Sequence, residues 1–218
     1  MNKKSIVQTG RSMIEMLGVL AIIGVLSVGG LVGYSKAMER YRVNETINQI
    51  THIVQNTRDL FKTQPNYGRG LSGSGTANAV MSNGNFSNRK LADKAKLFPT
   101  SLVKNGYKNL FDGEIRFFAD GLFSESDVKA FIIAFYGIPQ SACIEILTHD
   151  WRSNLGLAII GAIANNTNAI VDNLTVPCTS SYSAGRGYFC NGYMPVTVEQ
   201  AITICSSEKN NQISWKFY

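Results

Sequence analysis

The chain has 218 residues, of which 44% are hydrophobic, 10% aromatic and 17% charged, and 20 of them are glycine. This composition is ordinary for a folded protein of one or two domains, and the chain is long enough to bury a substantial core. The net charge is +6, and three of the basic residues, Lys3, Lys4 and Arg11, precede an apolar run. The remaining basic excess is small, so a nucleic-acid partner is not expected.

The first element in chain order is an uncharged apolar run of twenty residues, 16–35. At about 1.5 Å per helical residue it reaches about 30 Å, which is the thickness of the hydrocarbon layer of a membrane. Lys3 and Lys4 are expected to hold the short N-terminal side in the cytoplasm and to place the rest outside it. A cleaved signal peptide and a plain signal anchor are alternatives. Glu15, at the edge of the run, argues against both.

Helical patterning continues beyond the apolar run, because residues 34–61 contain neither proline nor glycine. Apolar residues recur close to one face of a 3.6-residue period, namely Ile47, Ile50, Ile53, Val54, Leu60 and Phe61. We therefore predict one long helix from about Met13 to Phe61. Its first half is expected to be bare and its second half to pack on a globular domain.

The middle of the chain begins with a segment rich in Gly, Ser and Asn, residues 66–88, which predicts a long irregular connection. A short helix is expected over residues 89–97, ending before Pro99. Two strand-like runs follow at 114–119 and 128–136, and the second is rich in Ile and Phe.

The last third starts with a helix for which Pro139 suits the first position. Residues 155–163 indicate either a third strand or a buried helix, and polar loops are expected through 165–192. Thr197 and Gln200 have the spacing of a capping box, which predicts another helix. The chain closes on residues 212–218, where apolar and polar residues alternate as in a strand with one buried face.

All four cysteines lie in the part expected outside the cytoplasm, where disulfides form. Cys143 and Cys205 fall on two expected helices, whereas Cys178 and Cys190 bracket an eleven-residue loop rich in Gly, Ser and Tyr. Of the three possible connectivities we favour Cys143 with Cys205 and Cys178 with Cys190. A zinc site is the rival interpretation, but no Cys-x-x-Cys pair supports it.

The N-terminus resembles that of type IV pilins and related prepilin-like proteins. The residues that carry this resemblance are Gly10, Glu15 five positions later, the apolar run, and the two lysines upstream. In that family a membrane-embedded aspartyl peptidase cuts after the glycine and methylates the new N-terminus. The resemblance implies a cut between Gly10 and Arg11. Arg11 differs from the apolar residue that usually comes first in the mature chain.

The same resemblance implies a role for Glu15. A carboxylate without a partner is costly inside a bilayer. In pilin filaments the partner is the N-terminal amine of a neighbouring subunit. Glu15 would therefore set the axial register of an incoming subunit, and lateral packing of the apolar helices would hold the filament core.

The C-terminal third is similar to the type IVb subclass of pilins, through the stretch GIPQSAC and the stretch VEQAITIC before the terminal strand. The implied fold is α+β: a long N-terminal transmembrane and amphipathic helix packed on an antiparallel sheet, the pilin α/β roll. A disulfide-closed C-terminal region would run from Cys143 to Cys205. The expected domains are a leader at 1–10, the helix at 11–61 (about 13–35 transmembrane) and an extracytoplasmic globular domain at 62–218.

The implied function is that of a structural subunit of a type IV pilus, used for adhesion, aggregation or conjugation-type contact. Its partners would be further copies of the chain, a prepilin peptidase, an inner-membrane assembly platform and membrane lipid. The precursor would lie in the inner membrane with a periplasmic globular domain, and the assembled pilus would be extracellular.

Two other functions stay open: a minor pilin or pseudopilin of a type II secretion-like system, and a membrane-anchored periplasmic binding protein. Enzymatic activity, a metal and a cofactor are not expected. The chain has two histidines and no accompanying nucleophile motif, and the glycines at 68–75 lack the Lys-Ser/Thr of a phosphate-binding loop.

Overall fold

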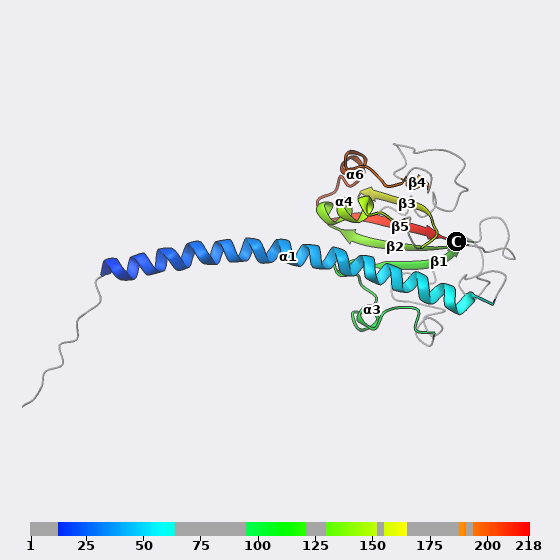
Figure 1. Ribbon diagram of the computed structural model, residues 1–218, viewed down its shortest axis with the longest axis horizontal. Coiled ribbons are helices and arrows are strands. Elements are labelled where there is room, and N and C mark those ends of the chain that lie inside the picture. Colours follow the sequence, from blue (N-terminus) through cyan, green and yellow to red (C-terminus); the bar gives the residue numbers. More distant parts are fainter. Residues whose placement is uncertain (1–12, 64–94, 121–129, 152–154, 165–187, 191–193) are drawn as a thin grey trace, which may run out of the picture. The chain divides into compact units, whose positions relative to one another are not determined.

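The computed structural model describes residues 13–63, 95–120, 130–151, 155–164, 188–190 and 194–218 (Figure 1). Its elements are α1 (Met13–Phe61), α3 (Thr100–Lys104), β1 (Ile115–Asp120), β2 (Ala130–Ile138), α4 (Gln140–Thr148), β3 (Leu157–Ala164), β4 (Tyr188–Cys190), α6 (Val198–Ile204) and β5 (Asn211–Phe217). The chain divides into two compact units, Met1–Tyr41 and Arg42–Tyr218.

The first unit contains the apolar part of α1, and its large side chains are exposed all around the helix. Leu17 is 65% exposed, Ile22 62% and Val25 75%. A helix that is apolar on every side has no face suited to water, and is typical of a membrane span or of the interior of a larger assembly. This stretch is therefore built to be covered by something other than its own unit.

In the second unit α1 becomes amphipathic and contributes one face to the core. Its buried residues in this unit are Val43, Thr46, Gln49, Ile50, Ile53, Val54 and Thr57. The Asn56 side chain donates hydrogen bonds to the carbonyls of Lys96 (3.0 Å) and Leu97 (3.3 Å). Arg58 donates to the carbonyl of Tyr218. These contacts attach the end of α1 to two segments that are distant in sequence.

The sheet of the second unit has the strand order β1-β2-β5-β3-β4, and every neighbouring pair is antiparallel. The C-terminal strand β5 lies in its centre, between β2 and β3 (Figure 1). Trp215 is opposite Ile133 on one side and Ile160 on the other, so the three side chains share one face. The last residues of the chain thus complete the middle of the core.

Aromatic rings cross the sheet in a continuous series. Phe98 lies 5.7 Å from Phe117, Phe117 5.7 Å from Phe131, and Phe131 5.5 Å from Phe217, measured between ring centroids. Ring pairs at this separation contribute about 0.5–1.5 kcal/mol each beyond the area they bury. The series connects the segment before α3 with β1, β2 and β5.

A tight turn before β1 is organised by the buried side chain of Asn109. Its Nδ2 donates to the carbonyl of Tyr136 (2.7 Å), and its Oδ1 accepts from the backbone N–H groups of Phe111 (2.9 Å) and Gly113 (3.0 Å). The backbone at Gly113 approaches β2 so closely that a Cβ there would lie 1.8 Å from the Tyr136 oxygen. Only glycine fits at this position.

Helices α4 and α6 pack against each other and are joined by the disulfide between Cys143 and Cys205, whose Cα atoms are 6.0 Å apart. The capping box predicted for α6 is confirmed: Thr197 Oγ1 accepts from Gln200 N (3.3 Å), and Gln200 Oε1 accepts from Thr197 N (3.0 Å). Pro139, predicted as the first residue of α4, is instead its N-cap in extended conformation, and the helix begins one residue later.

Several expectations change in the folded chain. The run at 155–163 is a strand, β3, and a three-residue strand, β4, lies within the stretch 165–192 that was expected to be all loop. Residues 95–97 are not helical, and a short helix, α3, follows Pro99 instead. The rest of the expected helix at 89–97, and the connection at 66–88, lie outside the described residues.

The alternation in the last strand was expected to leave one face exposed, and this was wrong. All seven residues of β5 are buried, including Gln212, Ser214 and Lys216. The physical reason is that packing covers both faces of β5, while a strand lies on each side of it. Such a position cannot be deduced from alternation alone.

Candidate functional site

Glu15 lies in the first turn of α1 as the structure describes it. It is the only charged residue in the first 23 residues of the helix, 13–35, and the side chains that follow it are exposed and apolar. An acidic side chain near a helix N-terminus is stabilised by the helix dipole, by about 0.3–1 kcal/mol. The helix dipole would stabilise Glu15 whatever residues followed it. It therefore does not explain why Glu15 is followed by a long apolar stretch.

The apolar part of α1 is the one described helix that is long and apolar enough to cross a membrane. None of its most apolar stretch is buried within the protein, which distinguishes it from the core helix of a globular domain. The two processing residues, Gly10 and Arg11, lie outside the described residues, so the predicted cleavage site stays a prediction.

The predicted cysteine pairs have different outcomes. Cys143 and Cys205 are joined, and both are fully buried. The second predicted pair, Cys178 with Cys190, stays a prediction. Cys178 lies outside the described residues, and Cys190 is described only as part of the backbone of β4. Within the described residues no group of three or more His, Cys, Asp or Glu side chains could hold a metal ion.

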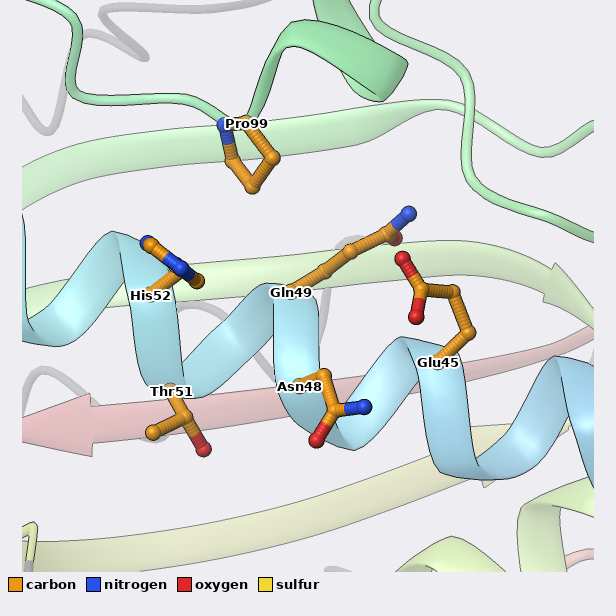
Figure 2. A pocket seen from close by; sticks show the side chains of 6 residues that line it. All are labelled: Glu45, Asn48, Gln49, Thr51, His52 and Pro99. Atoms are coloured by element: carbon orange, nitrogen blue, oxygen red, sulfur yellow. The ribbon is translucent and has the colours of Figure 1, made fainter.

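A groove of about 380 Å³ lies beside α1 in the second unit (Figure 2). Its lining residues are Glu45, Asn48, Gln49, Thr51 and His52 from the helix, with Pro99 from the segment before α3. Glu45, Asn48, Gln49 and His52 are spaced as positions i, i+3, i+4 and i+7, so they share one side of the helix. Figure 2 shows the oxygen ends of Glu45 and Gln49 turned toward one another.

Gln49 is the unusual member of this groove, because it is only 2% exposed. Its Nε2 donates a long hydrogen bond of 3.5 Å to Ser101 Oγ, and its Oε1 has no hydrogen-bond partner. Sequence analysis did not single out this residue. Its burial could have been predicted from its position on α1, because Gln49 lies on the same side of the helix as Thr46 and Ile50, which face the core.

The fold built from these parts is that of a type IV pilin. TcpA, a type IV pilin from the Vibrio cholerae El Tor biotype, has a similar structure with a TM-score of 0.53 and 16% sequence identity, over 82% of this chain and 99% of that chain. A type IV b pilin from Salmonella typhi is 18% identical, with a TM-score of 0.41, over 78% of this chain and 97% of that chain. No curated protein matches the sequence.

The family follows from the sequence of the folded region. A family model described as PilS N terminal matches residues 40–217, which is most of the chain. The chain therefore belongs to the PilS family, and its fold is that of a type IV pilin. The expected α+β fold with a long N-terminal helix, an antiparallel sheet and a disulfide-closed C-terminal region is confirmed.

Proposed function

We propose that this pilin is inserted in the inner membrane through residues of about 13–35 and polymerises from there into an extracellular filament. The filament would serve adhesion, aggregation or conjugation-type contact. The observation that carries the proposal is the apolar half of α1, exposed on every side and preceded by a single carboxylate, Glu15. Exposed apolar area of this extent requires either lipid or neighbouring copies of the same helix.

Of these two environments, Glu15 favours the filament over lipid. In lipid, its carboxylate has no partner, and burying it there is costly. In a filament it would accept a charge-assisted hydrogen bond from the N-terminal amine of a neighbouring subunit, in surroundings of low dielectric where such bonds are strong. Transfer from membrane to filament would thus relieve the cost at Glu15 while the apolar side chains stay covered.

This proposal includes the partners and locations that filament assembly needs. A prepilin peptidase would remove residues 1–10, an inner-membrane platform would extract the subunit, and lipid would surround it before extraction. The globular domain would be periplasmic in the precursor and extracellular in the filament. No enzymatic activity is proposed.

The test is the replacement Glu15→Gln in cells that hold no other copy of the gene. We expect processing, insertion and folding to be unchanged, and filament yield to fall at least about tenfold, since a neutral amide cannot form the charged pair. Filaments sheared from the cells are quantified against the protein that stays in the membrane. Equal yields from variant and wild type would contradict the role of Glu15.

The same measurement separates the alternatives. A pilus subunit of the shaft makes up most of the sheared protein, whereas a minor pilin or pseudopilin is present there only in trace amounts. A membrane-anchored binding protein is absent from the sheared fraction in both wild type and variant.

A further inference from the structure

The groove beside α1 contains a buried hydrogen-bond acceptor that the subunit itself leaves unused. Gln49 is 2% exposed, and its Oε1 has no partner. Buried polar atoms in proteins are nearly always hydrogen-bonded, and one that lacks a partner is destabilising. Gln49 lines a groove that opens to the outside of the subunit (Figure 2), and its Oε1 is itself enclosed in the isolated chain.

The charge of the groove determines which donor suits it. The carboxylate of Glu45 lies at its rim and forms no ion pair with a described residue, and its oxygen end turns toward that of Gln49 in Figure 2. A carboxylate and an amide oxygen that converge on one point favour a cation with several N–H groups. A lysine ammonium or an arginine guanidinium has this chemistry.

The chain itself carries such cations in excess, since its net charge is +6, and loss of residues 1–10 with Lys3 and Lys4 still leaves +4. Lys104 and Lys209 are exposed and form no ion pair with another described residue. A second copy of the chain therefore offers a positive charge that complements the negative groove. Copies of the chain also meet at high local concentration in a filament.

From this geometry we infer that the groove formed by Glu45, Asn48, Gln49, Thr51, His52 and Pro99 receives a lysine or arginine side chain from a second copy of this chain. The inference rests on the proposed function, because it concerns the assembled filament. It adds an ionic contact in the globular region to the contact proposed for Glu15 in the apolar region. The groove would be filled only after assembly.

One competing arrangement satisfies Gln49 within the subunit. If the amide is turned over, its nitrogen donates to Glu45 and its oxygen accepts from the Ser101 hydroxyl. In that arrangement Glu45 stabilises the isolated subunit, and a change at Glu45 lowers its unfolding midpoint. If the groove serves a second copy instead, the same change lowers assembly and leaves the midpoint of the subunit unchanged.

The first experiment locates the occupant by photo-crosslinking in assembled filaments. A benzoylphenylalanine is placed at Asn48, an exposed lining residue, and as a control at Asn44, which is exposed on the same helix but does not line the groove. We expect irradiation to yield a covalent dimer from the Asn48 position, mapped by mass spectrometry to a peptide around a Lys or Arg of the second copy. A crosslink only within one chain, or equal dimer yields from both positions, overturns the inference.

The second experiment measures the charge requirement. Glu45→Lys is compared with Asp59→Lys, because Asp59 is exposed on α1 and does not line the groove. We expect Glu45→Lys to lower sheared-filament yield about tenfold or more relative to Asp59→Lys, with equal unfolding midpoints in detergent. Gln49→Met, which keeps the side-chain volume and removes the acceptor, is expected to lower filament yield as well, without lowering the midpoint.

The outcomes distinguish this inference from the function on which it rests. If wild type and Asp59→Lys form filaments and Glu45→Lys forms as many, the inference fails and the proposed function stands. If Glu45→Lys lowers the unfolding midpoint instead, the turned-over amide is the correct arrangement and the inference also fails. If the wild type forms no filament, both fail together.

Discussion

At the scale of the single residue, the buried amide of Asn109 makes three hydrogen bonds to backbone groups. It joins the turn before β1 to the end of β2 through one donated and two accepted hydrogen bonds. We predict that Asn109→Ala lowers the free energy of unfolding by about 2–3 kcal/mol, since three backbone groups lose their partner. Urea unfolding of the detergent-solubilised chain measures this change.

The matched control for Asn109 is Asn44→Ala, at an exposed position of α1. A surface substitution of this kind changes stability by no more than about 0.5 kcal/mol. Similar losses from both variants would show that the hydrogen bonds of Asn109 do not organise the turn.

Gly10 and Arg11 are the residues between which we predict the chain to be cleaved. Gly10 follows Lys3 and Lys4 and precedes the apolar helix. This order predicts cleavage after position 10. We expect the intact mass of the membrane-extracted protein to correspond to a chain that starts at Arg11, with or without a methyl group. A chain that still starts at Met1, or one that starts beyond Gly29, would contradict this.

At the scale of the element, α6 depends on its N-terminal cap, because it is a short helix of seven residues. We predict that Thr197→Ala destabilises the protein by about 1 kcal/mol, through the unpaired N–H of Gln200. Hydrogen exchange at the Gln200 amide should become faster at the same time. Thr197→Ser keeps the hydroxyl and should restore slow exchange, and fast exchange in the serine variant would argue against the capping interpretation.

For the folded unit as a whole, the disulfide joins Cys143 of α4 to Cys205, the C-cap of α6, and these two cysteines are 62 residues apart in sequence. Closing a loop of this length stabilises a protein by about 4 kcal/mol in the chain-entropy model. We predict that the double change Cys143→Ala, Cys205→Ala lowers the free energy of unfolding by about that amount. Denaturant unfolding compared with oxidised wild type measures the loss, and a loss below about 1 kcal/mol would contradict the prediction.

Sequence patterns were sufficient for features that depend on neighbouring residues. The second half of the long helix, which ends at Phe61, follows from an uninterrupted helical period without proline or glycine. The cap of α6 follows from the spacing of Thr197 and Gln200. The class of protein was recognisable from Gly10, Glu15 and the apolar run, because this resemblance rests on residue types at fixed spacing within one continuous segment.

Only the tertiary structure decided the features that depend on distant partners. Strand order places β5 at the centre of the sheet, and tertiary packing buries Lys216 on a face that alternation predicts to be exposed. The acceptor at Gln49 is buried because the segment with Pro99 and Ser101, about fifty residues further along the chain, packs beside α1. Local sequence determines periodicity, caps and apolar length, whereas burial of a polar group depends on which remote segment covers it, and that is settled only when the chain folds.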